Sequence, residues 1–244
     1  MTNPVRPLRL FITGTDTGVG KTHVTCLIAR QMIARGFRVA AYKPVCSGAL
    51  PPTQSSSVVT PDFVYRWDDI ERLKAAIGGD WPDDWICPQR FIAPVAPPVA
   101  AKREGKTVDF QRLVDGVQPF HEMDCLLVEG AGGWLSPLTE TQSVSDLARR
   151  LNDPVLIVAR TGLGTINHTL MTVESIRARG LKVAGVVLNE PVALHDDASV
   201  CTNADEIEAR SGAPVFGTIP HGSDVELHRD GELVTINWQR LASH

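Results

Sequence analysis

A glycine-rich segment near the start of the chain ends in a lysine and a threonine. Residues 14–22 read Gly-Thr-Asp-Thr-Gly-Val-Gly-Lys-Thr and directly follow the apolar run 8–13. Backbone N–H groups in such a loop converge on phosphate oxygens, and a helix that starts behind the loop adds favourable partial charge. In this arrangement Lys21 reaches the β- and γ-phosphates of a nucleotide, and the hydroxyl of Thr22 binds Mg²⁺. The segment therefore predicts a nucleotide-phosphate loop.

This loop departs from the usual pattern at one position. The pattern G-x-x-x-x-G-K-[ST] requires glycine where this chain has Thr15, and the glycine comes one residue earlier. A plain turn between a strand and a helix would explain Gly18 and Gly20, but not a lysine and a threonine at the helix start. A packing or surface role suits the side chain of His23 better than a ligand role. The expected nucleotide contacts are the loop residues Thr15, Asp16, Thr17, Gly18, Val19, Gly20, Lys21, Thr22 and His23.

Two further charged residues come at the ends of apolar runs. Lys43 follows the run 38–42, and Glu129 closes the run 125–128. Beside a phosphate loop, Lys43 would stabilise charge on a transferring phosphoryl group, and Glu129 would hold Mg²⁺. The plainer interpretations are an exposed lysine before a turn and a solvated glutamate in a glycine-rich turn. The neighbouring Lys21 and Thr22 favour the functional interpretation of both residues.

Six apolar runs alternate with amphipathic segments and must position these residues. The runs are continuous, as expected for strands that are buried on both faces of a parallel sheet. The pattern predicts an α/β fold, with a mostly parallel sheet flanked by helices on both faces. The segment 48–89 is irregular, and we expect surface loops there with one short helix near 62–76. The predicted strands are 8–13, 38–42, 125–128, 155–159, 183–188 and 215–219, and the predicted helices are 22–35, 108–118, 143–150, 165–179 and 203–210.

Composition and charge limit the class of protein. The chain has 244 residues, 24 Lys and Arg, 28 Asp and Glu, and a formal net charge of −4. These values predict a single globular domain over 1–244, and they argue against a nucleic-acid or membrane partner. The sequence shows neither a membrane-length apolar run nor a signal peptide. Five cysteines, none at C-x-x-C spacing, predict free thiols in a cytoplasmic protein.

Taken together, the motifs resemble those of the dethiobiotin synthetase family, over most of the chain. The resemblance rests on G-T-D-T-G-V-G-K-T (14–22), K-P-V-C-S-G (43–48), V-E-G-A-G-G-W (128–134) and G-T-I-N-H (164–168). It implies a P-loop NTPase-like fold and a homodimer with sites at the interface. It also implies the ATP- and Mg²⁺-dependent closure of 7,8-diaminononanoate and CO₂ (or bicarbonate) into the cyclic urea of dethiobiotin, through a carbamate and a carbamic-phosphoric anhydride.

The resemblance also implies roles for individual residues. Lys21 and Lys43 would be catalytic, and Thr22, Asp62 and Glu129 would hold Mg²⁺. Asp62 is placed by order alone, so Asp68 and Asp69 stay open as alternatives. Many relatives carry Glu where this chain has Gly18. Adenine would contact Asn189 and the segment at Pro220. The substrate would contact Thr17, Ser47, Gly132 and Gly133, and the substrate carboxylate would bind Gly164 and Asn167 of the other subunit, although Asn167 also suits a simple helix cap.

Two other functions stay open at this point. One is a cobyrinate-type amide ligase, which usually needs a glutamine-hydrolysing domain of about 100 residues. The chain after the expected ATP domain is too short for such a domain. The other is a P-loop switch protein like the ATPases that partition chromosomes. Their signature lysine would fall at Asp16, and an aspartate cannot do its work, so this residue argues against a switch ATPase.

Overall fold

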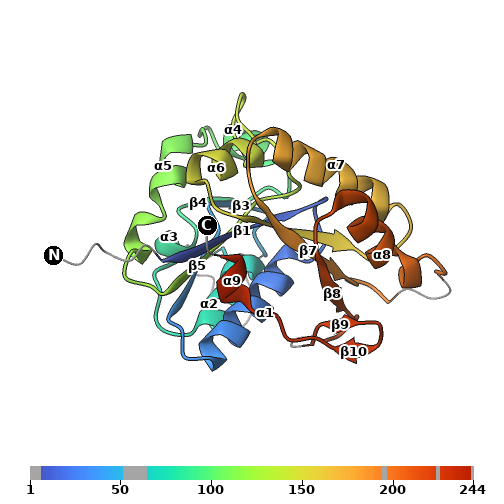
Figure 1. The fold of residues 1–244 in the computed structure, drawn as a ribbon. Helices are drawn as coiled ribbons and strands as arrows, with labels where there is room; N and C mark the ends of the chain where they lie inside the picture. Colours follow the sequence, from blue (N-terminus) through green and yellow to red (C-terminus); the bar gives the residue numbers. More distant parts are fainter. Residues whose placement is uncertain (1–6, 52–64, 194–196, 224–225, 243–244) are drawn as a thin grey trace.

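A central eight-stranded sheet organises the computed structural model, which describes residues 7–51, 65–193, 197–223 and 226–242 (Figure 1). Its strand order is β10-β9-β8-β7-β6-β1-β5-β2. The six strands from β8 to β2 are parallel, and β9 and β10 add an antiparallel edge. The strands are β1 (Leu8–Gly14), β2 (Val39–Tyr42), β5 (Cys125–Glu129), β6 (Val155–Arg160), β7 (Val183–Asn189), β8 (Val215–Ile219), β9 (His228–Arg229) and β10 (Glu232–Leu233).

The parallel strands are buried on both faces, which is why their sequences are continuous apolar runs. Successive side chains alternate between the two faces: Leu10 and Ile12 of β1 enter one apolar cluster, and Phe11 enters the other. All six strands predicted from the apolar runs are present, to within one residue at each end. The prediction of a mostly parallel sheet is confirmed.

Helices cover both faces of the sheet (Figure 1). The lower layer holds α1 (Lys21–Ala34), α2 (Asp68–Ile77) and α9 (Trp238–Leu241), and the short α3 (Asp83–Ile86) joins the same cluster. The upper layer holds α4 (Pro97–Arg103), α5 (Phe110–Asp115), α6 (Val144–Leu151), α7 (Thr165–Ala178) and α8 (Val200–Ser211), with the 3₁₀ turn η1 (Gln118–Phe120). This arrangement confirms the prediction of helices on both faces.

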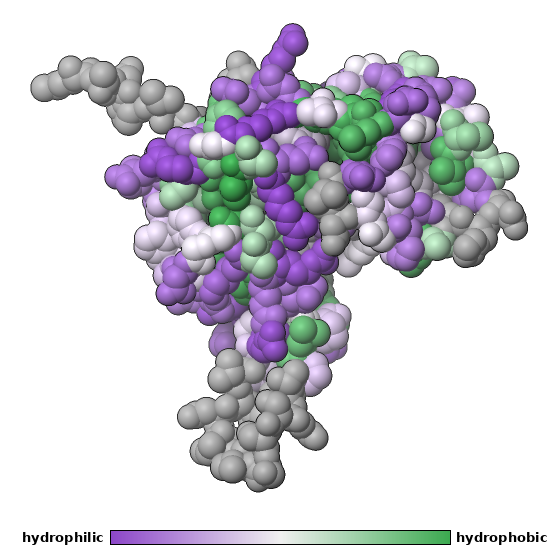
Figure 2. Space-filling view, turned by 90° about the horizontal axis from the view of Figure 1, so that it is seen from below, coloured by the Kyte–Doolittle hydropathy of each residue, from purple (hydrophilic) through white to green (hydrophobic). Residues whose placement is uncertain are grey.

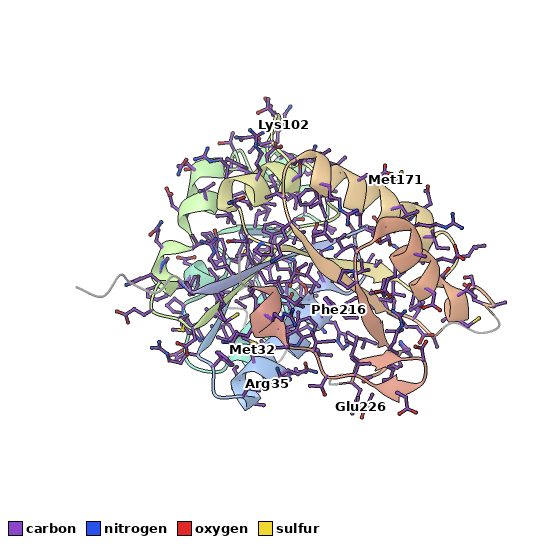
Figure 3. The ribbon with its side chains drawn as sticks, viewed as in Figure 1. Met32, Arg35, Lys102, Met171, Phe216 and Glu226 are labelled. Atoms are coloured by element: carbon purple, nitrogen blue, oxygen red, sulfur yellow. The ribbon has the colours of Figure 1, made fainter. Side chains whose placement is uncertain are left out.

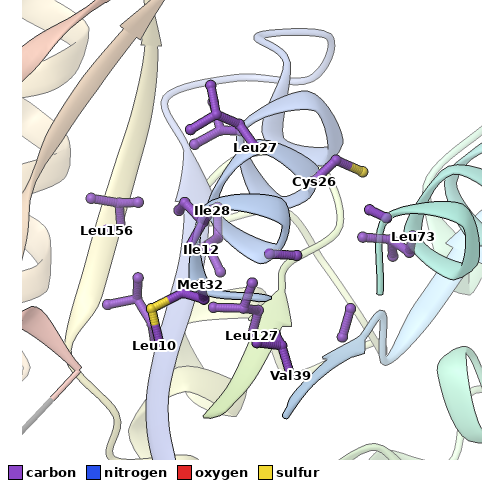
Figure 4. Packing of buried hydrophobic residues seen from close by; sticks show 14 of the residues in the cluster. Leu10, Ile12, Cys26, Leu27, Ile28, Met32, Val39, Leu73, Leu127 and Leu156 are labelled. Carbon is purple, nitrogen blue, oxygen red and sulfur yellow. The ribbon is translucent and has the colours of Figure 1, made fainter. Parts of the chain in front are cut away.

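Packing between α1 and α2 fixes the position of the second helix. Figure 4 shows Cys26 of α1 facing Leu73 of α2, while Leu27, Ile28 and Met32 cover the sheet. These side chains are almost fully buried. The two helices therefore share one core, and the start of α2 lies beside the start of α1.

The segment 48–89 contains more regular structure than the sequence indicated. The parallel pair β3 (Val45–Ser47) and β4 (Gln89–Phe91) encloses it, and each strand is too short to show a period. The helix expected near 62–76 begins at Asp68, because Trp67 is extended, and residues 62–64 lie outside the described residues. Three acidic residues in its first turn, Asp68, Asp69 and Glu71, suit the positive end of the helix dipole.

The surface is mostly polar on the face seen in Figure 2, where apolar residues form separate patches among hydrophilic ones. Within the described ranges, the helices are all too short or too polar to span a bilayer.

Candidate active site

The phosphate loop leaves β1 at Gly14 and enters α1 at Lys21. Gly18 and Gly20 have φ angles of 72° and 95°, a region that glycine adopts without steric cost. Gly20 occupies the N-cap position of α1 and brings no side chain to cover the first N–H groups of the helix. Those groups are therefore directed at the space above the loop, as an anion-binding helix start requires.

Lys21 lies over the loop and is almost completely buried. Its Nζ donates to the backbone oxygen of Asp16 at 3.0 Å. Burial, and next the nearby charge of Lys43, lower the pKa of Lys21 to about 8. A nucleotide phosphate would supply the negative charge that this ammonium needs.

Four side chains from distant parts of the chain meet beside the loop. The hydroxyl of Thr22 lies 2.9 Å from Asp69 Oδ1 and 2.8 Å from Glu129 Oε1. Lys43 Nζ donates to Glu129 Oε1 at 2.5 Å and to Asp69 Oδ2 at 2.9 Å. The carboxyl ends of β2 and β5 lie side by side in the sheet, so Lys43 and Glu129 meet although 86 residues separate them. We call Thr22, Lys43, Asp69 and Glu129 the phosphate-end cluster.

Lys43 is the buried cation of this cluster. Burial alone disfavours its charge, but the attraction of Glu129 and Asp69 outweighs burial and raises the pKa of Lys43 above its usual range. The charge of Lys43 and its hydrogen bond to Asp69 lower the pKa of Asp69, and they outweigh the burial of this carboxylate, which acts in the opposite direction. Lys43 is therefore an ammonium and Asp69 a carboxylate at neutral pH.

The donor set fits Mg²⁺. Glu129 is fully buried, and its Oε2 atom has no hydrogen-bond partner among the described residues. A buried carboxylate oxygen without a partner is costly, and a cation beside it would remove that cost. Mg²⁺ keeps several waters and needs only one or two carboxylates plus substrate phosphates. The absence of three clustered His, Cys, Asp or Glu side chains among the described residues is therefore compatible with this ion.

The structure distinguishes between the three candidate aspartates as far as they are described. Asp69 contacts Thr22 directly, whereas Asp68 is exposed on the first turn of α2. Asp62, the residue expected by order along the chain, lies outside the described residues. Among the described residues, Asp69 is the aspartate that can share an ion with Thr22 and Glu129.

A cavity of about 590 Å³ opens beside the cluster. The predicted residues that line it are Thr17, Gly18, Gly20, Lys21, Thr22, His23, Lys43, Ser47, Gly132, Asn189 and Pro220. His23 thus faces the cavity rather than serving only in packing. The cavity also has lining residues that the sequence analysis did not assign: Cys46, Arg72, Ala131, Glu190, Pro191, His221 and Gly222.

Some predicted residues lie away from this cavity. Thr15 and Asp16 line separate hollows behind the loop, and Val19 is buried beneath it. The N–H of Gly133 donates to Ser136 Oγ at 2.7 Å, and Gly133 lines one of the same hollows rather than the cavity. Gly164 and Asn167 are exposed at the start of α7. In one chain these residues are not brought to the phosphate-end cluster.

Known proteins match this chain over nearly its whole length. A family model described as an AAA domain matches residues 8–229. An ATP-dependent dethiobiotin synthetase BioD of Anaeromyxobacter sp. (strain Fw109-5) is 45% identical over 219 residues, which cover 88% of this chain and 91% of that protein. The same enzyme of Anaeromyxobacter dehalogenans (strain 2CP-C) is 43% identical over 217 residues, with the same coverage. The chain belongs to the ATP-dependent dethiobiotin synthetase family.

Similar solved structures agree on the fold alone. The chloroplast FtsY of Physcomitrella patens has a TM-score of 0.53 at 15% identity, and the match covers 99% of this chain and 66% of that one. FtsY of Mycoplasma mycoides has a TM-score of 0.52 at 15% identity, with 98% and 67% covered. This chain thus spans about two thirds of the FtsY chains. Its fold is that of a P-loop NTPase, as predicted.

In this member of the dethiobiotin synthetase family, an ion pair supports the phosphate loop from β6. Arg160 Nη2 donates to Asp16 Oδ2 at 3.0 Å and to the backbone oxygen of Thr17 at 3.3 Å. Sequence reasoning could not find Arg160, because 144 residues separate it from Asp16 and only the β1–β6 pairing brings the two together.

Gly20 and Asn189, the residue expected to contact adenine, lie in close contact at the wall of the cavity. Asn189 Nδ2 donates to the backbone oxygen of Val19 at 3.0 Å, and a Cβ on Gly20 would lie 2.1 Å from that nitrogen. We expect Gly20→Ala to displace the Asn189 amide and to break its hydrogen bond to Val19. The loss of one neutral hydrogen bond should weaken ATP binding by about tenfold. Isothermal titration calorimetry of ATP binding measures this change.

The matched control for that prediction is Gly36→Ala. Gly36 has a φ of 88°, close to that of Gly20, but a Cβ there would meet nothing within 4 Å. Both variants carry the same backbone strain of about 1–2 kcal/mol. If Gly36→Ala weakens ATP binding as much as Gly20→Ala, the contact with Asn189 is not the cause.

The lowered pKa of Lys21 predicts a pH dependence of ATP binding. Only the protonated lysine attracts phosphate, so raising the pH through about 8 removes the binding-competent form of the free protein. The Kd for ATP should therefore be constant well below pH 8 and should rise toward tenfold per pH unit above it. A Lys21→Arg variant keeps its charge, so its Kd should stay flat from pH 7 to about 9.5. An equally steep rise in that variant would assign the pH dependence to another group.

Proposed function

We propose that this protein catalyses the ATP- and Mg²⁺-dependent closure of 7,8-diaminononanoate and CO₂ into dethiobiotin, a step of biotin synthesis. The observation that carries this proposal is the phosphate-end cluster. A buried ammonium, two carboxylates and a hydroxyl meet at the end of a phosphate loop, where a phosphoryl group would be transferred. The family relationship supports the same reaction.

The proposed chemistry needs positioning and charge neutralisation rather than a protein nucleophile. One amine of the substrate captures CO₂ as a carbamate. A carbamate oxygen then takes the γ-phosphoryl group of ATP and releases ADP. The second amine attacks the carbamic carbon of this mixed anhydride, phosphate leaves, and the five-membered urea closes.

The two lysines have different tasks in this proposal. Lys21 binds the β- and γ-phosphates and exchanges its contact with Asp16 for phosphate oxygens. Lys43 points at the same end from a buried position and stabilises charge that develops as the phosphoryl group moves. Its two carboxylate partners hold it in place, so little reorganisation is needed at the moment of transfer.

Mg²⁺ would be held by Thr22, Glu129 and Asp69. When bound, the ion supplies Lewis-acid neutralisation of the triphosphate oxygens. Of the aspartates that the sequence analysis left open, we propose Asp69, because its carboxylate lies 2.9 Å from the Thr22 hydroxyl.

Adenine would bind at Asn189 and the segment Pro220–Gly222. The Asn189 amide donates to Val19, so its oxygen is the atom left to accept a hydrogen bond. An acceptor there suits the exocyclic amine of adenine and repels the carbonyl of guanine. Ser47, Gly132 and Thr17 also line the cavity and would contact the carbamate, and Gly133 lines a neighbouring hollow.

We further propose a homodimer in which each subunit completes the other's site. Exposed apolar side chains gather near the start of α7: Leu135, Leu163 and Met171 are 58%, 87% and 52% exposed. Figure 3 shows Met171 pointing outward from this helix. Two buried hydroxyls near the helix start, those of Thr161 and Thr165, have no partner among the described residues. Together with Gly164 and Asn167 they would bind the carboxylate of the partner's substrate.

Purified protein with ATP, MgCl₂, bicarbonate and 7,8-diaminononanoate tests the proposal. Mass spectrometry should detect the cyclic urea, with one ADP and one phosphate formed per ring. ATP hydrolysis that ignores the diamine, with no urea, would reject it. A cobyrinate-type ligase or a switch ATPase would give that second result. Sedimentation at the enzyme concentration of the assay tests the dimer, and a monomer that retains full activity would contradict the shared site.

We place the reaction in the cytoplasm. The five cysteines are all free thiols, and such thiols persist in a reducing compartment. The proposed partners are small molecules rather than nucleic acid or membrane, in a single domain over 1–244 with a net charge of −4.

A further inference from the structure

The nucleotide cavity contains a third cation that has no role in the proposed reaction. Among the described residues that line it, three are lysine or arginine: Lys21, Lys43 and Arg72. Lys43 is committed to two carboxylates, and Lys21 contacts the backbone of the loop. ATP carries about four negative charges, and charged oxygens form strong hydrogen bonds with a guanidinium. Arg72, whose contacts are longer than those of Lys43, is free to turn toward them.

Arg72 holds a fixed place on a well-packed helix. It lies one turn after Asp69 on α2, and the neighbouring Leu73 packs into the core against α1 (Figure 4). The Cys26 thiol donates to the backbone oxygen of Arg72 at 3.4 Å, which ties the two helices at this residue. The backbone of Arg72 is therefore positioned as firmly as that of Asp69.

The guanidinium of Arg72, in contrast, is held loosely. Its Nη1 lies 3.7 Å from Asp68 Oδ2, and its Nη2 lies 3.5 Å from His23 Nδ1. Charge-assisted hydrogen bonds are shorter, at about 2.7–2.9 Å. The Arg72 side chain is 43% exposed and that of Asp68 is 61% exposed, so the pair contributes little to stability. Turning the guanidinium toward a phosphate costs little.

The neighbours of Arg72 indicate which phosphate it would meet. All four of these residues line the cavity: Lys21, Lys43, Pro220 and His221. In the proposed function, on which this inference rests, the two lysines bind the β- and γ-phosphates and the other two residues lie at the base, which are the two ends of the nucleotide. His23 lies between these ends: it contacts Arg72 on one side and the backbone oxygen of Ser223 on the other, at 2.7 Å. We propose that Arg72 is a nucleotide-binding residue of this protein, which contacts the α-phosphate from helix α2 when ATP binds.

The test is nucleotide binding without the diamine, so that its outcome is independent of whether the ring closes. In displacement of a fluorescent ATP analogue, Arg72→Ala should raise the Kd for ATP, ADP and AMP alike, each by about tenfold. The Kd for adenosine should not change. Arg72→Lys should recover part of the loss, since it restores the charge but not the planar fork.

Lys74→Ala is the matched control. The substitution removes one positive charge from the same helix as Arg72→Ala does. Lys74, however, pairs with Asp83 at 2.7 Å and does not line the cavity. This variant should bind all four ligands as the wild type does. Equal affinities for Arg72→Ala and the wild type would overturn the proposal. So would a loss confined to ATP, which would place Arg72 at the γ-phosphate, or an equal loss in Lys74→Ala, which would show a general field effect.

Discussion

Replacing Lys43 by methionine is expected to lower kcat by about 10²- to 10³-fold, the range observed when one preorganised donor to a developing charge is removed. Methionine keeps most of the volume of the lysine stem, so the loss reports the charge. Lys43 Nζ lies among Glu129, Asp69 and the phosphate loop, where the transferring group would pass. The measurement is single-turnover formation of ADP, followed by steady-state kcat and KM for ATP.

The same substitution should also destabilise the protein without Mg²⁺. It leaves two carboxylates beside each other, one of them fully buried, without their cation. Breaking a buried ion pair from one side costs about 3–5 kcal/mol, and we expect the free energy of unfolding in urea to fall by roughly that much. If Mg²⁺ binds at this cluster in the folded state, as we propose, adding MgCl₂ should restore part of the difference.

Lys102→Met controls for loss of a lysine. Lys102 is exposed in the last turn of α4, at the top of the view in Figure 3. Its substitution should leave both kcat and stability unchanged. A Lys43→Met protein that turns over within twofold of the wild type would remove Lys43 from the mechanism.

Glu129→Gln is expected to produce a similar loss of turnover, about 10²-fold or more, for a different reason. Glutamine keeps the shape of the side chain but removes the charge that holds Lys43 and receives the Thr22 hydroxyl. It also removes the unpartnered Oε2 anion that fits a cation. The Mg²⁺ concentration for half-maximal activity should therefore rise, and a titration with MgCl₂ at saturating ATP measures it. Wild-type Mg²⁺ dependence in this variant would exclude Glu129 as a ligand.

A double-mutant cycle separates the ion pair from the metal. Without Mg²⁺, Lys43→Met leaves the carboxylates of Glu129 and Asp69 without their cation, and Glu129→Gln leaves Lys43 with Asp69 alone. The double variant removes both members of the Lys43–Glu129 pair. The double variant should therefore lose less stability than the sum of the two single variants. Additive losses would mean that the contact between Lys43 and Glu129 does not couple them in solution.

Much of the sheet could be predicted from the sequence, because strands buried on both faces must be apolar throughout. The run before Lys43 and the run that ends in Glu129 became β2 and β5, and both residues lie at the same sheet edge. The short pairs, β3 with β4 and β9 with β10, were missed, since two or three residues carry no period. The start of α2 was placed too early, because the sequence did not show that Trp67 is extended and that the helix begins at Asp68.

Local spacing could not show which residues from distant segments meet at the site. Asp69 contacts Thr22, although 47 positions separate them along the chain. The alternatives Asp62 and Asp68 have the same side chain, so side-chain type did not distinguish them. Arg72 gave no signal at all, because a lysine or arginine on a helix is usually a surface residue. Gly133 was expected in the cavity with Gly132, but its amide is taken by Ser136.

The sequence by itself determined the fold class, the nucleotide loop and the family, because apolar periodicity and a contiguous motif are local properties of a chain. Only the tertiary structure decided that Lys43, Asp69, Glu129 and Thr22 form one cluster, and that Arg72 rather than Gly133 faces the nucleotide cavity. The physical reason is that the order of strands and the packing of α2 on α1 depend on contacts between residues far apart along the chain. The net charge of −4 for the whole chain gave no indication that Lys21, Lys43 and Arg72 line one cavity among the described residues.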